Sequence, residues 1–104
     1  MDLGLIGKVA IVTGGSKGIG RATALALALE GADVSICARG IEDLEDAAAE
    51  IRSKCGRRVL AVRADMTAAE DIQHLVASTV AELGGVDILV NNAVNSVAAP
   101  FMEL

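Results

Sequence analysis

Short apolar runs alternate along the whole chain with longer segments that have helical spacing. The first run, at 8–13, predicts a buried strand, and the Ala/Leu-rich segment after it predicts a helix over about 19–30. The order then repeats, with strands expected at 33–38, 59–64 and 86–91 and helices expected over 42–54 and from 67 to the glycines at 84–85. Strands that alternate with helices across short connections predict an α/β fold with a parallel sheet.

The last two predicted helices carry clear apolar faces. In the second helix the apolar positions are Leu44, Ala47, Ala48, Ile51 and Cys55, and in the third they are Ile72, Leu75, Val76, Thr79, Val80 and Leu83. The segment from Thr67 to Glu70 has the spacing of a capping box, so Thr67 is expected to cap the third helix. His74 lies off the apolar stripe and is expected to be a solvated surface residue.

Right-handed crossovers restrict how such strands can be arranged. If the first three strands step in one direction and the fourth returns beside the first, the strand order is 3-2-1-4. This is the N-terminal half of a doubly wound, Rossmann-like sheet, with two helices on one face and the third on the other. Ligands bind such sheets outside the carboxyl ends of the strands, where the order reverses. Residues 14–20 and 91–93 should meet at that point.

Composition narrows the class of protein. The 104 residues suffice for one small domain and are 53% hydrophobic, with one Phe and no Tyr or Trp. A net charge of −5 argues against nucleic acid or an anionic membrane as the main partner, and no apolar run suits a signal peptide or a membrane span. Cys37 and Cys55 have no metal-binding spacing, so we expect reduced thiols, no metal site and a cytoplasmic location.

The chemistry of the chain centres on the turn from Thr13 to Gly20, which reads TGGSKGIG between the first strand and the first helix. Glycines allow the backbone to approach a ligand closely, and the N-terminus of the following helix attracts a phosphate. The phosphate loop of nucleotide triphosphatases is excluded because Arg21 and Ala22 stand where Lys and Ser/Thr are required. The common G-x-G-x-x-G pattern also fits poorly, because Thr23 follows Gly18-Ile19-Gly20 in place of glycine.

The remaining pattern, T-G-x-x-x-G-x-G, resembles the glycine motif of the short-chain dehydrogenase/reductase family. Further motifs at consistent spacing extend the resemblance over the whole chain, which is similar to the N-terminal part of the classical, NADP-preferring type. The resemblance implies that residues 1–104 are an incomplete dinucleotide-binding domain. It also implies that the cofactor pyrophosphate lies against Gly14, Ser16, Gly18, Ile19 and Gly20.

The end of the second strand bears on the choice between NAD and NADP. An acidic residue there would bind the ribose 2′-hydroxyl, but the chain has Ala38 and Arg39, and Asp33 lies at the opposite end of the strand. Arg39 offers a planar set of donors to a 2′-phosphate, and Lys17 adds a second positive charge. The pair resembles the NADP-preferring pattern of the family, so we expect NADP(H). The alternative is that both are solvated loop cations.

Two further segments match family motifs. Asp65 and Met66 follow the third strand and, by resemblance, would border the adenine ring; alternatively Asp65 only caps the third helix. Residues 91–94 resemble the family segment N-N-A-G, which places Asn91 and Ala93 at the cofactor. Val94 departs from that pattern, and because a β-branched residue disfavours positive φ, the loop beyond should run differently.

The resemblance implies that the catalytic residues of the family are not among these 104 residues. The family's catalytic Ser and Tyr-x-x-x-Lys lie beyond the N-N-A-G segment, and this chain contains no Tyr, so no catalytic residue is assigned. We therefore expect the NADP(H)-binding portion of an oxidoreductase that, when complete, interconverts a carbonyl and an alcohol. The alternatives are a non-catalytic NADPH-binding module and an unstable remnant. The exposed sheet edge and face are expected to cause self-association.

Overall fold

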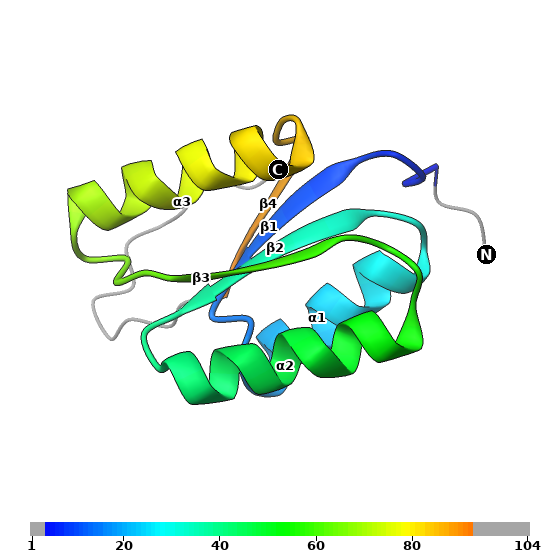
Figure 1. Ribbon diagram of the computed structural model, residues 1–104, viewed down its shortest axis with the longest axis horizontal. Coiled ribbons are helices and arrows are strands. Elements are labelled where there is room, and N and C mark those ends of the chain that lie inside the picture. Colours follow the sequence, from blue (N-terminus) through cyan, green and yellow to red (C-terminus); the bar gives the residue numbers. More distant parts are fainter. Residues whose placement is uncertain (1–3, 93–104) are drawn as a thin grey trace.

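The computed structural model describes residues 4–92, which form one parallel sheet with helices on both faces (Figure 1). Ala93, at the proposed cofactor site, and Val94 lie outside the described residues. The elements are β1 (Val9–Thr13), α1 (Gly18–Leu29), β2 (Asp33–Ala38), α2 (Ile41–Lys54), β3 (Val59–Arg63), α3 (Ala69–Leu83) and β4 (Ile88–Asn91).

The strand order is β3-β2-β1-β4 with all neighbours parallel, which confirms the order predicted from the sequence. Val9 is in register with Asp33, and Thr13 is in register with both Cys37 and Asn91. The carboxyl ends of β1, β2 and β4 therefore lie side by side. Helices α1 and α2 cover one face of the sheet, while α3 lies on the other (Figure 1), as expected from right-handed crossovers.

Successive side chains of each strand point to opposite faces of the sheet, so the core consists of two clusters. Val12, Val34 and Ile36 point toward α1 and α2, where Leu44 and Ile51 complete a fully buried layer. On the opposite face the smaller cluster comprises Ile11, Cys37, Val62, Ala64 and Leu75. The α1 and α2 side is packed mainly with alanine and aliphatic side chains, which allows the helices to approach the sheet closely.

The face that carries α3 is only partly covered within the described residues. Leu75, Thr79 and Leu83 of the predicted stripe are buried, and Thr79 donates a hydrogen bond of 2.9 Å to Ser35 of β2. Ile72 and Val76 of α3, Val86 of the following loop and Leu89 of β4 are each at least 40% exposed and line one cavity. We call these four side chains the α3–β4 apolar face. No helix in the described part of the chain is both long and apolar enough to cross a membrane.

The start of α3 differs from the sequence prediction. Thr67 does not cap this helix, because its backbone N–H and its hydroxyl both donate to Asp65 Oδ1, at 2.9 and 2.7 Å. Ala68 is the N-cap residue instead, and no side chain caps the helix. A local turn between Asp65 and Thr67 thus forms in place of the capping box. Short polar side chains can bind nearby backbone groups in this way instead of capping a helix.

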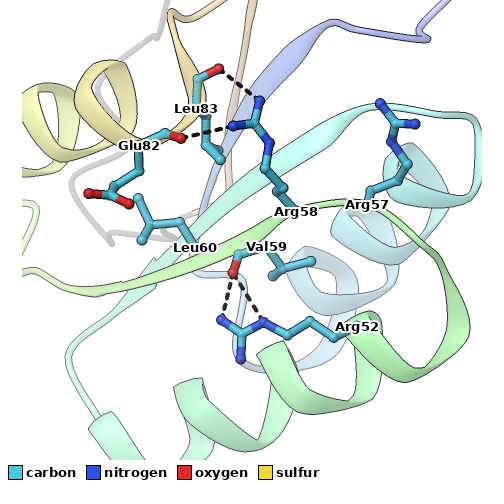
Figure 2. A pocket seen from close by; sticks show the side chains of 7 residues that line it. All are labelled: Arg52, Arg57, Arg58, Val59, Leu60, Glu82 and Leu83. Carbon is cyan, nitrogen blue, oxygen red and sulfur yellow. Dashed lines mark hydrogen bonds between the residues drawn. The ribbon is translucent and has the colours of Figure 1, made fainter.

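A cluster of arginines closes the opposite, amino end of the sheet (Figure 2). Arg58 donates to Asp33 at 2.9 Å and to the carbonyls of Glu82 and Leu83, at 3.1 and 3.3 Å. Arg52 donates to the Val59 carbonyl at 2.6 Å. The guanidinium groups thereby satisfy backbone carbonyls at the end of α3 and the start of β3, which gives this cluster a structural role.

Candidate functional site

The turn between β1 and α1 depends on its glycines for two different reasons. Gly14 and Gly18 have φ of +66° and +55°, a conformation that other residues rarely adopt. A side chain at Gly20 would place its Cβ 2.1 Å from the Gly14 carbonyl oxygen, so α1 begins directly against the turn. Gly15 donates its N–H to the Cys37 carbonyl at 3.1 Å, which fastens the turn to the end of β2.

The N-terminus of α1 is left open toward this turn. Lys17 is the N-cap residue, its side chain makes no capping hydrogen bond, and the first turn of the helix has no acidic residue. The first N–H groups of α1, from Gly18 to Gly20, therefore have no side chain to satisfy them, and the helix dipole adds partial positive charge. Ile19 is 78% exposed, and because its side chain is apolar, its backbone N–H is the group that can bind a phosphate. The arrangement suits a phosphate group.

Arg21 holds the turn in place, a role that was not predicted from the sequence. Its Nε donates to Glu50 of α2 at 2.6 Å, its Nη1 lies 3.3 Å from Asp46, and the same Nη1 donates to the Ser16 carbonyl at 3.5 Å. The hydrogen bond to Glu50 raises the pKa of Arg21 above its ordinary value. The residue that argued against a phosphate loop thus joins the turn to α2.

A cavity of about 850 Å³ opens at the carboxyl ends of the strands. Seven of the predicted site residues line it: Gly14, Ser16, Lys17, Arg39, Asp65, Met66 and Asn91. Gly18, Ile19 and Gly20 lie beside it in the turn and first residues of α1 but are not part of the lining. All four side chains of the α3–β4 apolar face line it too, so the cavity joins a polar end at the turn to an apolar end beneath α3.

Both predicted cations line this cavity. The side chain of Lys17 is 77% exposed, and its Nζ lies 3.1 Å from Asp43 Oδ2 in the first turn of α2. Arg39 is exposed, and its carbonyl accepts a hydrogen bond of 3.1 Å from Arg63 Nε at the end of β3. The pairing of Lys17 with Asp43 was not foreseen, because the two residues are brought together only by the packing of α1 against α2.

Asp65 has a defined orientation at the far wall of the cavity. The hydroxyl and then the N–H of Thr67 lower the pKa of its carboxyl, so it is held as a carboxylate. Its own N–H donates to Asp71 Oδ2 at 2.8 Å, which fixes the backbone between β3 and α3. Both hydrogen bonds from Thr67 go to Asp65 Oδ1, and the residue lines the cavity.

The last residues of β4 are tied to the end of β1. The Thr13 hydroxyl donates to Asn91 Oδ1 at 3.0 Å and accepts the backbone N–H of Asn92 at 2.9 Å. Asn92 also lines the cavity, and its buried Nδ2 has no hydrogen-bond partner among residues 4–92. A buried amide without a partner is uncommon and indicates a donor that a ligand can satisfy. The sequence places Asn92 in the segment at this edge of the sheet, but only Asn91 and Ala93 were predicted to contact the cofactor.

Cys37 forms part of the cavity wall without being a reactive group. It is fully buried, and burial raises the pKa of its thiol, so the thiolate is disfavoured. Cys55 donates to the Ile51 carbonyl at 3.1 Å, and both cysteines are free thiols. The two residues behave as small core side chains, as the sequence predicted.

Comparison with known proteins gives one consistent result. The family model for short chain dehydrogenases matches residues 8–104. L-xylulose reductase of Mus musculus is 42% identical over 104 residues, which are all of this chain and 39% of that protein. A short chain dehydrogenase/reductase of Aspergillus oryzae is 42% identical over 101 residues, which are 96% of this chain and 39% of the relative.

Solved structures agree with these matches. L-sorbose reductase from Gluconobacter frateurii, determined as a complex with NADPH and L-sorbose, superposes with a TM-score of 0.87 at 45% identity; the match covers 91% of this chain and 36% of the reductase. The hydroxysteroid dehydrogenase of Escherichia coli gives a TM-score of 0.83 at 36% identity, over 88% of this chain and 38% of its own. The chain thus spans about two fifths of the length of its relatives. The family model matches the chain from the first strand onward, and the sheet has the fold of the solved relatives. The chain therefore belongs to the short-chain dehydrogenase/reductase family.

Proposed function

We propose that this chain is the NADP(H)-binding part of an oxidoreductase that interconverts a carbonyl and an alcohol. The observation that carries the proposal is the position of Lys17 and Arg39, which line one cavity beside the uncapped N-terminus of α1. No acidic residue ends β2, where a free ribose 2′-hydroxyl would need an acceptor. The two cations favour a 2′-phosphate at that place.

The residues present fit a nicotinamide dinucleotide. The open N-terminus of α1 and the turn at Gly14 would hold the pyrophosphate, and Asp65 and Met66 would border the adenine. Nδ2 of Asn92, which has no partner within the described part of the chain, offers a further donor beside Asn91 for the nicotinamide side. When bound, the cofactor supplies or accepts the hydride. The similar L-sorbose reductase, which was solved with NADPH, supports this assignment.

The proposal is tested by replacing Arg39. In Arg39→Gln we expect the dissociation constant of NADPH to rise about tenfold, because a charged hydrogen bond to the 2′-phosphate is lost. The dissociation constant of NADH should change less than about twofold. Lys54→Gln is the matched control, since it removes one positive charge from the far end of α2. Equal losses for both cofactors in Arg39→Gln would contradict the proposal.

A second candidate function is cofactor binding without turnover. The sequence contains no Tyr, so it lacks the acid/base that the resemblance implies, while the cofactor cavity is present. Calorimetry would detect NADPH binding in either case. Oxidation of bound NADPH by a ketone would require the complete enzyme, and the 104-residue chain is expected to show none.

We also propose that the α3–β4 apolar face joins a second copy of the chain. The two free thiols, Cys37 and Cys55, are compatible with the reducing cytoplasm, which is where we place the protein.

A further inference from the structure

Lys17 is one of the two cations proposed to bind the 2′-phosphate, and it already forms an ion pair with Asp43. Lys17 Nζ and Asp43 Oδ2 are 3.1 Å apart, and their side chains are 77% and 56% exposed. An ion pair between two such exposed groups is weak and exchanges readily with other partners. An anion that binds Lys17 more strongly than Asp43 does can therefore replace Asp43 as its partner.

Arg21, the other cation beside the turn, is bound quite differently. Its Nε–Glu50 distance is 2.6 Å, it also contacts Asp46, and its side chain is only 28% exposed. It has two acidic partners on α2 as well as the Ser16 carbonyl. Lys17 has one carboxylate partner and a mobile stem, so Lys17 is the cation of this region that can change partner.

The place where a 2′-phosphate would lie is next to the start of α2. Gly40 is the N-cap residue of α2 and has no side chain to satisfy the first N–H groups. Glu42 and Asp43 are the acidic residues of the first turn, and Asp43 is the one that reaches Lys17. A phosphate that approaches Lys17 must therefore displace the Asp43 carboxylate and then remain near its charge.

We infer that Asp43 is a specificity-determining residue, an internal counter-ion that competes with the 2′-phosphate for Lys17 and lowers the preference for NADPH over NADH. This inference rests on the proposed cofactor assignment. NADH shares the pyrophosphate but brings no 2′-phosphate to Lys17, so its affinity should depend much less on the pair. Asp43 thus sets how strongly the site discriminates between the two cofactors.

The experiment is a calorimetric titration of NADPH and of NADH into the 104-residue chain and its Asp43→Asn variant. Removing the competing charge should tighten NADPH about fivefold and leave NADH within about twofold, with a gain that shrinks as ionic strength rises. Glu45→Gln is the matched control, because it removes an exposed acid from the same helix that has no ion pair with Lys17. That control should change the NADPH affinity by less than about twofold.

A second variant separates competition for Lys17 from a general change in charge. In Lys17→Gln/Asp43→Asn the gain should vanish, because there is no cation left to release. If Asp43→Asn tightens NADPH equally with and without Lys17, the pair is not the cause and the inference is wrong. Circular dichroism of each variant checks that α2 is retained after its first turn loses a favourable acid.

The outcomes distinguish this inference from the cofactor assignment. If the wild type prefers NADPH but Asp43→Asn leaves the ratio of the two affinities unchanged or reduces it, Asp43 does not compete, while the cofactor assignment stands. If the wild type shows no preference and Asp43→Asn creates one, the competition is supported and only the wild-type preference is overturned. If neither protein discriminates, both proposals are wrong.

Discussion

At the scale of single residues, the site is built from backbone that only glycine permits. Gly14 and Gly18 supply positive φ, and Gly20 supplies room, because any Cβ there would overlap the Gly14 carbonyl. The turn can therefore point its N–H groups at a ligand while α1 begins directly behind it. These requirements follow from the motif itself, which is why the turn was predictable from the sequence.

Gly20→Ala tests the steric part of this account. The added Cβ would lie 2.1 Å from the Gly14 carbonyl oxygen and must push the turn away from α1. We expect a loss of about 3 kcal/mol in the free energy of unfolding and loss of cofactor binding. Gly56→Ala, where nothing lies within 4 Å of the added carbon, should change stability by less than about 0.5 kcal/mol. Urea unfolding measures both, and similar losses would refute the steric argument.

At the scale of elements, Asp33 and its arginines join β2, β3 and α3. Asp33 is buried at the amino end of β2 and accepts from the backbone N–H and the guanidinium of Arg58, while Arg57 Nε lies 3.5 Å away. Arg58 continues to the last carbonyls of α3, as Figure 2 shows for Glu82 and Leu83. Arg58, which directly precedes β3, thus connects this strand with β2 and α3 at the end of the sheet remote from the cofactor cavity.

The pH dependence of stability follows from this contact. Burial alone would raise the pKa of Asp33, but the hydrogen bonds and charge of Arg58, together with the charge of Arg57, outweigh it and lower the pKa below its ordinary value. A lowered folded-state pKa gives a contribution that is complete above the unfolded value and is lost as the pH falls through the folded value. Asp33→Asn should therefore destabilise the chain at pH 7, by about 2 kcal/mol, and much less at pH 2.

Thermal unfolding of wild type and Asp33→Asn at several pH values measures this difference. Asp46→Asn is the control, because its contact with Arg21 is exposed and should contribute less than about 1 kcal/mol at any pH. A difference between Asp33→Asn and wild type that stays constant from pH 7 to pH 2 would rule out the carboxylate as its source.

The elements also show which features a single sequence can predict. Strand order, helix faces and the end of α3 at Gly84, where φ is +97°, follow from periodicity, chirality and glycine chemistry. The start of α3 does not, because Thr67 donates to Asp65 and the Asp65 N–H donates to Asp71, so the capping box does not form. Arg21 and Asp43 were missed because their partners lie on another helix, which no local pattern reveals.

At the scale of the whole molecule, the sheet is covered unequally. Helices α1 and α2 cover one face and bury most of its strand residues, while among the described residues α3 alone lies on the other (Figure 1). The α3–β4 apolar face exposes four large aliphatic side chains around one cavity, and β4 is an edge strand among the described residues. An apolar patch beside an unpaired strand favours association.

We therefore expect the 104-residue chain to self-associate at micromolar concentration in sedimentation velocity runs. Val76→Glu places a charge in the middle of the α3–β4 apolar face and should shift the population toward monomer. Ala49→Glu adds the same charge to an exposed position on α2, on the opposite face, and should leave the association unchanged. A wild-type chain that sediments as a monomer would contradict this expectation.

The most direct test of the central claim is a side-by-side titration of NADPH and NADH into the unmodified chain at fixed ionic strength. With Lys17 and Arg39 both lining the cavity and no acid at the end of β2, NADPH should bind at least about tenfold more tightly. That preference should weaken with added salt, because both cations are exposed. Equal affinities, or tighter binding of NADH, would contradict the proposed preference of this chain for NADP(H).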